Sequence, residues 1–313
     1  MAGNGLVSIG ECMLELSGRA DRDGDGADWR MGFAGDTLNT LWALRALTGS
    51  ERTANYVSAF GDDPFSRDQI AFLGANGIGI GESPIIPGAR PGLYAITLTG
   101  AERSFTYWRN DSAARQLASD PARLAKSLEN QALVYFSGIT LAILDPASRR
   151  TLIYAVNVAR KAGSLIAFDA NYRPRLWKSR DEARIAIDEA LSVTDIALPT
   201  FPDEQSLYGD GSPEATANRL SAAGVPEIVV KNGELAATVR HAGRTDTIAA
   251  VHVASPVDTT GAGDSFNGSY LAARLAGLAP AEATRKAHAV AAAVVQVRGA
   301  LAPHETLRAA FKS

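Results

Sequence analysis

The 313-residue chain has one cysteine, Cys12, and four histidines scattered along its length. A single thiol cannot form an intramolecular disulfide, and it is typical of a protein from a reducing compartment. Without a cysteine pair or an H-E-x-x-H motif, no zinc site is indicated. No apolar run reaches the roughly 18–20 residues that span a bilayer, and the first residues lack the basic and apolar regions of a secretory signal. These absences predict a soluble, cytoplasmic protein.

The chain also lacks a large excess of either charge, because 31 basic residues nearly balance 34 acidic ones and leave a formal net charge of −3. This balance gives no electrostatic reason to expect nucleic acid or an anionic membrane as a partner. An anionic substrate would therefore need a local basic site. With 46% hydrophobic and 21% charged residues, the composition is that of a globular protein rather than a disordered one.

Short apolar segments alternate with helical patterns over most of the chain, which favours a mostly parallel sheet covered by helices on both faces. The strand candidates are residues 6–11, 55–61, 132–138, 164–171, 195–200 and 227–233, and the clearest early helices are 35–49, with Asp36 or Thr37 as its cap, and 63–77. Ligands of such α/β sheets bind beyond the carboxyl ends of the strands. Four polar residues follow predicted strands and are expected there: Asp169, Asn171, Arg173 and Lys231.

Two segments depart from this alternation. Residues 90–110 alternate apolar and polar side chains around TGAER, as a β-hairpin does, and residues 17–35 are rich in glycine and aspartate. We expect one large domain over residues 1–313, with residues of about 12–34 and 84–114 forming a small β excursion over its edge.

The stretch VDTTGAGDSFNGSYLAARLAG (257–277) places a glycine-rich turn before a helical pattern. Gly261 and Gly263 allow a sharp bend, and the amides at a helix start attract an anion or a developing negative charge. Asp264 could take a proton from a nearby hydroxyl. The local pattern fits a capped helix after a turn equally well, with Asp264 as the cap, so both interpretations stay open at this point.

Other phosphate-binding and nucleophile motifs are absent. The chain has no G-x-x-x-x-G-K-[ST] sequence, and GAGDSFNG does not satisfy G-x-G-x-x-G because Phe266 occupies the third glycine position. No Ser–His–Asp arrangement is supported either.

Seven segments, in order along most of the chain, resemble the ribokinase-like (PfkB) sugar kinases, and within that family the branch that phosphorylates 2-keto-3-deoxygluconate. They are GECMLEL (10–16), FAGDTLNT (33–40), RPGLYAI (90–96), TYWRN (106–110), FSGITLAIL (136–144), FDANYRPRLW (168–177) and DTTGAGDSF (258–266). The resemblance implies a ribokinase-like three-layer α/β sandwich with a small β-sheet lid. It also implies ATP and Mg²⁺ as cosubstrates and a sugar-acid hydroxyl as the acceptor.

The resemblance also assigns residues. It implies Asp264 as the catalytic base and Gly261, Ala262 and Gly263 as an anion hole that also contacts the nucleotide. The implied sugar-acid contacts are Gly35, Asp36, Asn39, Tyr94, Tyr107, Arg109 and Arg173, the two arginines pairing with the carboxylate. The implied nucleotide contacts are Asn171, Lys231, Asn232 and Gly233.

The sequence departs from the family pattern at three places. Ala34-Gly35 stands where paired glycines are common, which could stiffen the lid hinge. Residues 197–207 lack a clear Asn-x-x-Glu element, so Asp203 and Glu204 are candidates to hold metal-bound water or simply to lie at the surface. Asp258 is a candidate to order the loop or to hold a monovalent cation.

Two alternatives to a 2-keto-3-deoxygluconate kinase follow from the same residues. One is a kinase of the same fold for fructose, ribose or another sugar acid such as 2-keto-3-deoxygalactonate. The other is a catalytically silent sugar- or nucleotide-binding regulator, which would not need a positioned base. Because the edge of the aromatic hairpin needs covering, we also expect a homo-oligomer, most simply a dimer formed through the lid.

Overall fold

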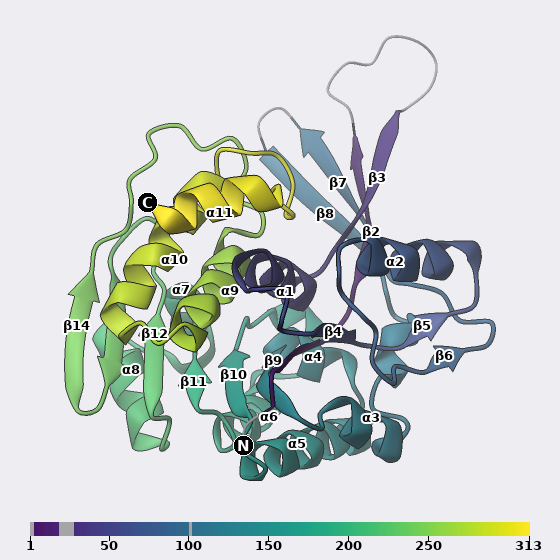
Figure 1. Ribbon diagram of the computed structural model, residues 1–313, viewed down its shortest axis with the longest axis horizontal. Coiled ribbons are helices and arrows are strands. Elements are labelled where there is room, and N and C mark those ends of the chain that lie inside the picture. Colours follow the sequence, from purple (N-terminus) through teal and green to yellow (C-terminus); the bar gives the residue numbers. More distant parts are fainter. Residues whose placement is uncertain (1–2, 19–27, 100–101) are drawn as a thin grey trace.

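The computed structural model describes residues 3–18, 28–99 and 102–313. Its main sheet has the strand order β14-β13-β12-β11-β10-β9-β1-β4 (Figure 1). These strands are β1 (Gly5–Ile9), β4 (Ala54–Val57), β9 (Gln131–Ser137), β10 (Leu165–Asp169), β11 (Ile196–Ala197), β12 (Glu227–Val230), β13 (Ala237–His241) and β14 (Arg244–Ile248). Neighbours from β4 to β12 pair in parallel, and β12, β13 and β14 pair antiparallel. The predicted α/β class with a mostly parallel central sheet is confirmed.

Helices cover both faces of this sheet because alternate strand residues point to opposite sides. In β9, Leu133 and Tyr135 enter one hydrophobic core, while Val134 and Phe136 enter the other. The first core packs against α1 (Asp36–Leu47), α2 (Pro64–Ala75), α9 (Ala262–Leu275), α10 (Pro280–Val294) and α11 (His304–Lys312). The second packs against α3 (Pro121–Ser127), α4 (Gly138–Ile143), α5 (Pro146–Lys161), α6 (Arg180–Leu191), α7 (Phe201–Tyr208) and α8 (Pro213–Ala222). In the described part of the chain, no helix is long and apolar enough to cross a membrane.

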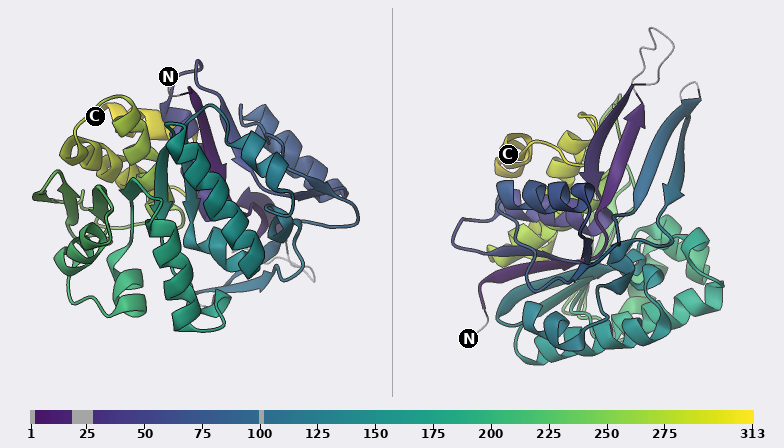
Figure 2. Two further views of the ribbon diagram at one scale, coloured as in Figure 1. Left: turned by 90° about the horizontal axis from the view of Figure 1, so that it is seen from below. Right: turned by 90° about the vertical axis from the view of Figure 1, so that its right-hand side faces the viewer.

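A second, four-stranded sheet projects from the main body (Figure 2). Its strand order is β3 (Trp29–Ala34), β2 (Met13–Gly18), β7 (Leu93–Thr99) and β8 (Glu102–Trp108). The predicted hairpin is confirmed as the antiparallel pair β7–β8, although Gly100 and Ala101 of its turn lie outside the described residues. The glycine- and aspartate-rich segment 17–35 contributes the end of β2 and all of β3, and its residues 19–27 also lie outside the described part.

Some strand boundaries differ from the sequence-based expectation. The segment 55–61 is two strands, because β4 joins the main sheet whereas β5 (Phe60–Gly61) pairs with β6 (Ile85–Ile86) in a separate two-stranded sheet. The segment 227–233 ends as a strand at Val230. The antiparallel pair β13–β14 extends the edge of the main sheet and was not predicted. Two short 3₁₀ helices, Ala113–Gln116 and Pro174–Leu176, complete the elements.

Candidate active site

A cleft of about 430 Å³ opens where β10, β11 and β12 end and α9 begins. The residues that line it come from strand ends, from the turn before α9 and from the second sheet. They are Phe105, Asp169, Asn171, Arg173, Thr200, Lys231, Thr259, Thr260, Gly261, Gly263 and Asp264. The four polar residues expected beyond the strand ends therefore converge with the glycine-rich turn, although they lie far from it along the chain.

Helix α9 begins at a turn that only glycine fits well. Its N-cap residue is Gly261, whose φ of 74° lies in the left-handed region, and an added Cβ would lie 2.7 Å from the carbonyl oxygen of Ala300. No side chain caps this helix, so of the two interpretations left open, the one with Asp264 as the cap is wrong: Asp264 lies inside the first turn. Asp258 orders the loop before the turn by accepting hydrogen bonds from the amides of Thr260 and Gly299. The helix start therefore lines the cleft without a side-chain cap.

Asp264 is partly buried and is held by a residue from the first helix. Asn39 donates from Nδ2 to Oδ2 of Asp264 at 2.8 Å. Burial, followed by repulsion from Asp36, raises the pKa of Asp264 to about 7, and the hydrogen bond from Asn39 opposes that rise. A carboxyl group with a pKa near neutrality, set beside an uncapped helix start, is suited to exchange protons in a reaction at physiological pH.

The start of α1 is built around a close approach of two backbone segments. Gly35 is its N-cap residue, and an added Cβ there would lie 2.1 Å from the carbonyl oxygen of Glu11. Neither Asp36 nor Thr37 caps the helix, which corrects the expectation from the sequence. The carboxylate of Asp36 instead accepts a hydrogen bond of 2.8 Å from Nδ2 of Asn171. Asn171 has a φ of 34°, a conformation that asparagine tolerates better than most residues.

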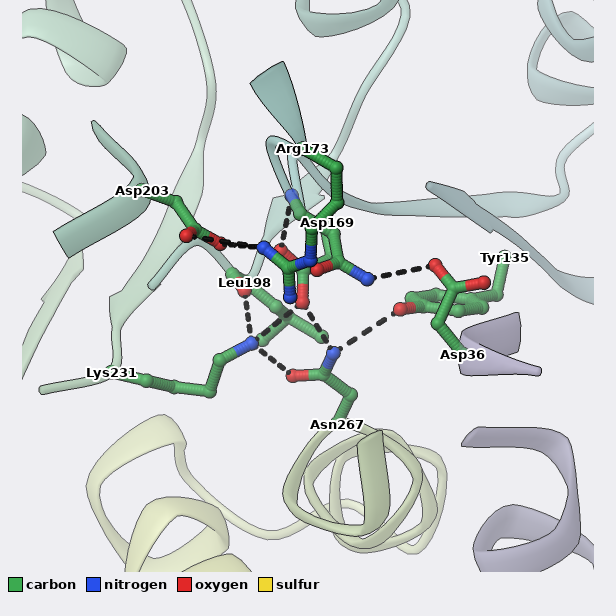
Figure 3. Close-up of polar contacts among 9 residues, drawn as sticks. Asp36, Tyr135, Asp169, Arg173, Leu198, Asp203, Lys231 and Asn267 are labelled. Atoms are coloured by element: carbon green, nitrogen blue, oxygen red, sulfur yellow. Dashed lines mark hydrogen bonds and ion pairs between the residues drawn. The ribbon is translucent and has the colours of Figure 1, made fainter. Parts of the chain in front are cut away.

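Lys231 lies at the centre of a buried polar network (Figure 3). Its ammonium donates to Oδ2 of Asp169 and Oδ1 of Asn267, both at 2.7 Å, and to the carbonyl oxygen of Leu198. These contacts use all three of its N–H donors within the protein. The following Asn232 and Gly233, also expected at the nucleotide, do not line the cleft.

Arg173 is the guanidinium that lines the cleft. Its Nη1 donates to both carboxylate oxygens of Asp203, at 3.0 and 3.2 Å, and half of its side chain stays exposed. Burial raises the pKa of Asp203, an effect that Arg173 counteracts. Glu204 faces away from this pair and is buried against Arg219, and burial raises its pKa to about 7.

Three other expected sugar contacts do not line the cleft: Tyr94 and Tyr107 belong to the second sheet, and Arg109 directly follows β8. Arg109 is buried and forms an ion pair with Glu11, and its guanidinium lies 5.9 Å from the ring centre of Tyr107. The hydroxyl of Tyr94 donates to Glu15, and its ring lies 5.7 Å from that of the half-exposed Tyr107. The second sheet instead contributes Phe105 to the cleft, two residues before Tyr107 and so on the same side of the strand. That spacing was the signal in the sequence that could have indicated Phe105.

Comparison with known proteins gives this site its class. A parallel α/β sheet whose strand ends face the start of a helix is a common setting for phosphate-containing ligands. The sequence profile of the pfkB family carbohydrate kinases matches residues 4–307, and the chain belongs to that family of kinases.

Two relatives that carry the same enzyme name are similar to the chain over nearly its full length. The chain is 39% identical over 316 residues to a 2-dehydro-3-deoxygluconokinase of Dickeya dadantii, with 99% of this chain and all of the relative covered. It is 40% identical over 311 residues to the enzyme of the same name from Escherichia coli K12, covering 97% and 99% of the two chains. Among solved structures, an E. coli protein assigned as ribokinase II, in complex with ATP and Mg²⁺, superposes with a TM-score of 0.84 at 23% identity over 99% of each chain. This last likeness concerns the fold.

Proposed function

We propose that the protein is an ATP-dependent 2-keto-3-deoxygluconate kinase, which transfers the γ-phosphoryl group of ATP to the 6-hydroxyl of the sugar acid. The observation that carries the proposal is the placement of Asp264 and Arg173 in one cleft, at the uncapped start of α9. The two relatives named 2-dehydro-3-deoxygluconokinase support the same substrate. A coupled assay of ADP release, run with sugar acids and neutral sugars, tests the proposal: no release with 2-keto-3-deoxygluconate would overturn it.

In the proposed reaction Asp264 is the general base. It accepts the proton of the substrate hydroxyl as that oxygen attacks the γ-phosphorus in line with the departing ADP oxygen. Asn39 holds the carboxylate in place for this transfer. The backbone amides of Gly261, Ala262 and Gly263 stabilise the negative charge of the group in transit, because they belong to a helix start that no side chain caps.

The cleft suits a polyphosphate chain and a divalent cation. The turn of Thr259 to Gly263 supplies an anion cradle, and we propose that Asn171, Asn232 and Gly233 contact the nucleotide from the strand ends. Among the described residues, no group of three or more His, Cys, Asp or Glu side chains is placed to hold a metal ion. Mg²⁺ neutralises phosphate charge when bound, and we propose that phosphate oxygens and water supply most of its ligands, with Asp203 and Glu204 acting through water at most.

We propose that the sugar acid is held between the first helix and the second sheet, which acts as a lid. Arg173 pairs with its carboxylate, and Gly35, Asp36 and Asn39 contact its hydroxyl and keto groups. We propose that Tyr94, Tyr107 and Arg109 lie on the lid side of the sugar, behind Phe105, which lines the cleft itself. Both arginines have a carboxylate partner, but Arg173 is 50% exposed and lines the cleft, whereas Arg109 is 7% exposed. Arg173 therefore carries the larger expected share of the carboxylate binding.

Replacing Arg173 with alanine should raise the KM for the sugar acid roughly 10- to 100-fold, the usual worth of a hydrogen-bonded charge pair. The kcat/KM for a neutral sugar should stay the same, because such a substrate has no carboxylate to lose. Steady-state kinetics on both substrates measure this. Arg175→Ala, an exposed arginine two residues away that does not line the cleft, is the matched control. Equal losses for both substrates would contradict the role of Arg173.

The rate should depend on pH through Asp264. Its pKa is raised to about 7, so the carboxyl is protonated, and unable to accept a proton, at lower pH. We therefore expect kcat/KM to fall about tenfold for each pH unit below that value and to level off above it. The residual activity of an Asp264→Asn variant should lack this acidic limb. A flat wild-type profile between pH 5 and 7 would show that Asp264 is not the base.

We also propose that the lid joins two copies of the chain. Three large apolar side chains lie on the face of the second sheet opposite to Phe105 and Tyr107 and are at least 40% exposed: Trp29, Met31 and Trp108. Its outer strands β3 and β8 also present unpaired edges, which a second lid would cover. Light scattering at micromolar concentration should give the mass of a dimer, and Trp108→Glu should shift it to that of a monomer. A monomeric wild type would refute this assembly. We place the protein in the cytoplasm, where ATP is available and its single thiol stays reduced.

A further inference from the structure

The buried ammonium of Lys231 joins four structural elements at the floor of the cleft (Figure 3). Lys231 follows β12, Asp169 ends β10, Leu198 follows β11 and Asn267 belongs to α9. Lys231, Asp169 and Asn267 are 6%, 4% and 0% exposed. A cation enclosed by three oxygen acceptors from distant parts of the chain fixes their relative positions, because each N–H···O contact has a narrow range of length and angle.

Asn267 connects this network to the proposed catalytic turn. It lies three residues after Asp264 on α9, so both side chains project from the same side of the helix. Its Oδ1 accepts from Lys231, while its Nδ2 donates to Asp169 at 2.8 Å and to the hydroxyl of Tyr135 at 3.1 Å. The N-terminal part of α9 is therefore held to the sheet through the fully buried amide of Asn267 in its second turn, which Lys231 and Asp169 orient from two directions.

We propose that Lys231 is a positioning residue: its ammonium holds Asn267 and thereby sets the location of Asp264 and of the amides at Gly261–Gly263 over the strand ends. This inference rests on the proposed kinase function. It changes the role of Lys231 from the nucleotide contact that the family resemblance implies to a positioning residue. A lysine beside a phosphate site is expected to bind phosphate, but the donors of Lys231 are all used within the protein. The two roles predict different kinetics. A phosphate ligand lowers the KM for ATP, whereas a positioning residue raises kcat.

The test is Lys231→Ala together with rescue by small amines. We expect kcat to fall roughly 100-fold, as when reacting groups are displaced by about 1 Å, with the KM values for ATP and sugar acid changed less than about threefold. Ethylammonium should restore part of kcat because it brings three N–H donors to the vacated space. Tetramethylammonium has the charge but no donor and should restore nothing. Lys126→Ala, at an exposed lysine on α3, should have wild-type kinetics.

Asn267→Leu is the second variant, with the same branching at Cγ and the same number of side-chain heavy atoms, and neutral like the native residue. It should show the same loss of kcat with KM retained. Neither amine should restore kcat, because this variant lacks the Asn267 oxygen that accepts the hydrogen bond and still has the ammonium of Lys231. If Lys231→Ala does not fold, this variant decides the question. A raised KM for ATP with kcat kept, or equal rescue by both amines, would overturn the positioning role.

Amide hydrogen exchange makes the test independent of catalysis. Lys231→Ala should speed exchange over residues 262–267 while leaving α5 unchanged, and ethylammonium should reverse the effect. An inactive wild type would refute the proposed function and leave this inference standing. Unchanged amide exchange at the start of α9 in Lys231→Ala would refute the inference.

Discussion

Replacing Asp264 with asparagine should lower kcat roughly 10²- to 10⁴-fold while leaving nucleotide binding nearly unchanged. Asparagine has the size of aspartate, and its side-chain oxygen can accept the same hydrogen bond from Asn39. The geometry is kept and only the ability to take the proton is lost. Single-turnover kinetics with saturating ATP and sugar acid measure the effect on chemistry, and a rate close to that of the wild type would remove Asp264 as the base.

The same variant should be more stable than the wild type above neutral pH. The pKa of Asp264 is raised in the folded protein, so folding favours the protonated form, and the wild type loses that stability as the pH rises from about 4 through about 7. Asparagine has no proton to lose. Thermal unfolding at pH 8 should therefore give a higher midpoint for Asp264→Asn, and the difference should shrink toward pH 5. A loss of activity accompanied by a lower midpoint at pH 8 would point to damaged folding instead.

Local periodicity was enough to predict the main sheet and the place of the cleft. The strands before Asp169 and Lys231 are short apolar runs between helical patterns, and parallel strands bring their carboxyl ends to one edge. The position of strand ends along the chain therefore predicted which polar residues meet. The strands β13 and β14 were not predicted, because they form an antiparallel extension of the sheet and do not follow the alternation of strand and helix.

The partner of each polar side chain could not be read from local sequence. Asp36 looks like a helix cap, yet its carboxylate accepts from Asn171, 135 residues away. Arg109 looks like a free guanidinium, yet it pairs with Glu11, 98 residues earlier in the chain. Such partners depend on how the two sheets pack against each other. Family resemblance gave the candidate residues of the site, but the structure was needed to show which groups they contact.

Gly261→Ala should have the second-largest effect on catalysis. The φ of 74° at this position costs an alanine about 1–2 kcal/mol, and its Cβ would press against the backbone of Ala300 at 2.7–3.0 Å. Relief requires the turn to move, which displaces the amides that we propose face the transferred group. Loss of a donor of this kind typically lowers kcat about 10²- to 10³-fold, measurable at saturating substrate concentrations.

Gly277→Ala separates displacement of the turn from loss of stability. Gly277 has a φ of 86° at the opposite end of α9, and a Cβ there would meet no atom within 4 Å. Both variants carry the same backbone strain, so both should unfold at a lower temperature than the wild type. Only Gly261→Ala moves the catalytic turn, so kcat should fall in that variant alone. If the two variants lose kcat equally, the effect comes from strain in α9, and the turn at Gly261 has no special part in phosphoryl transfer.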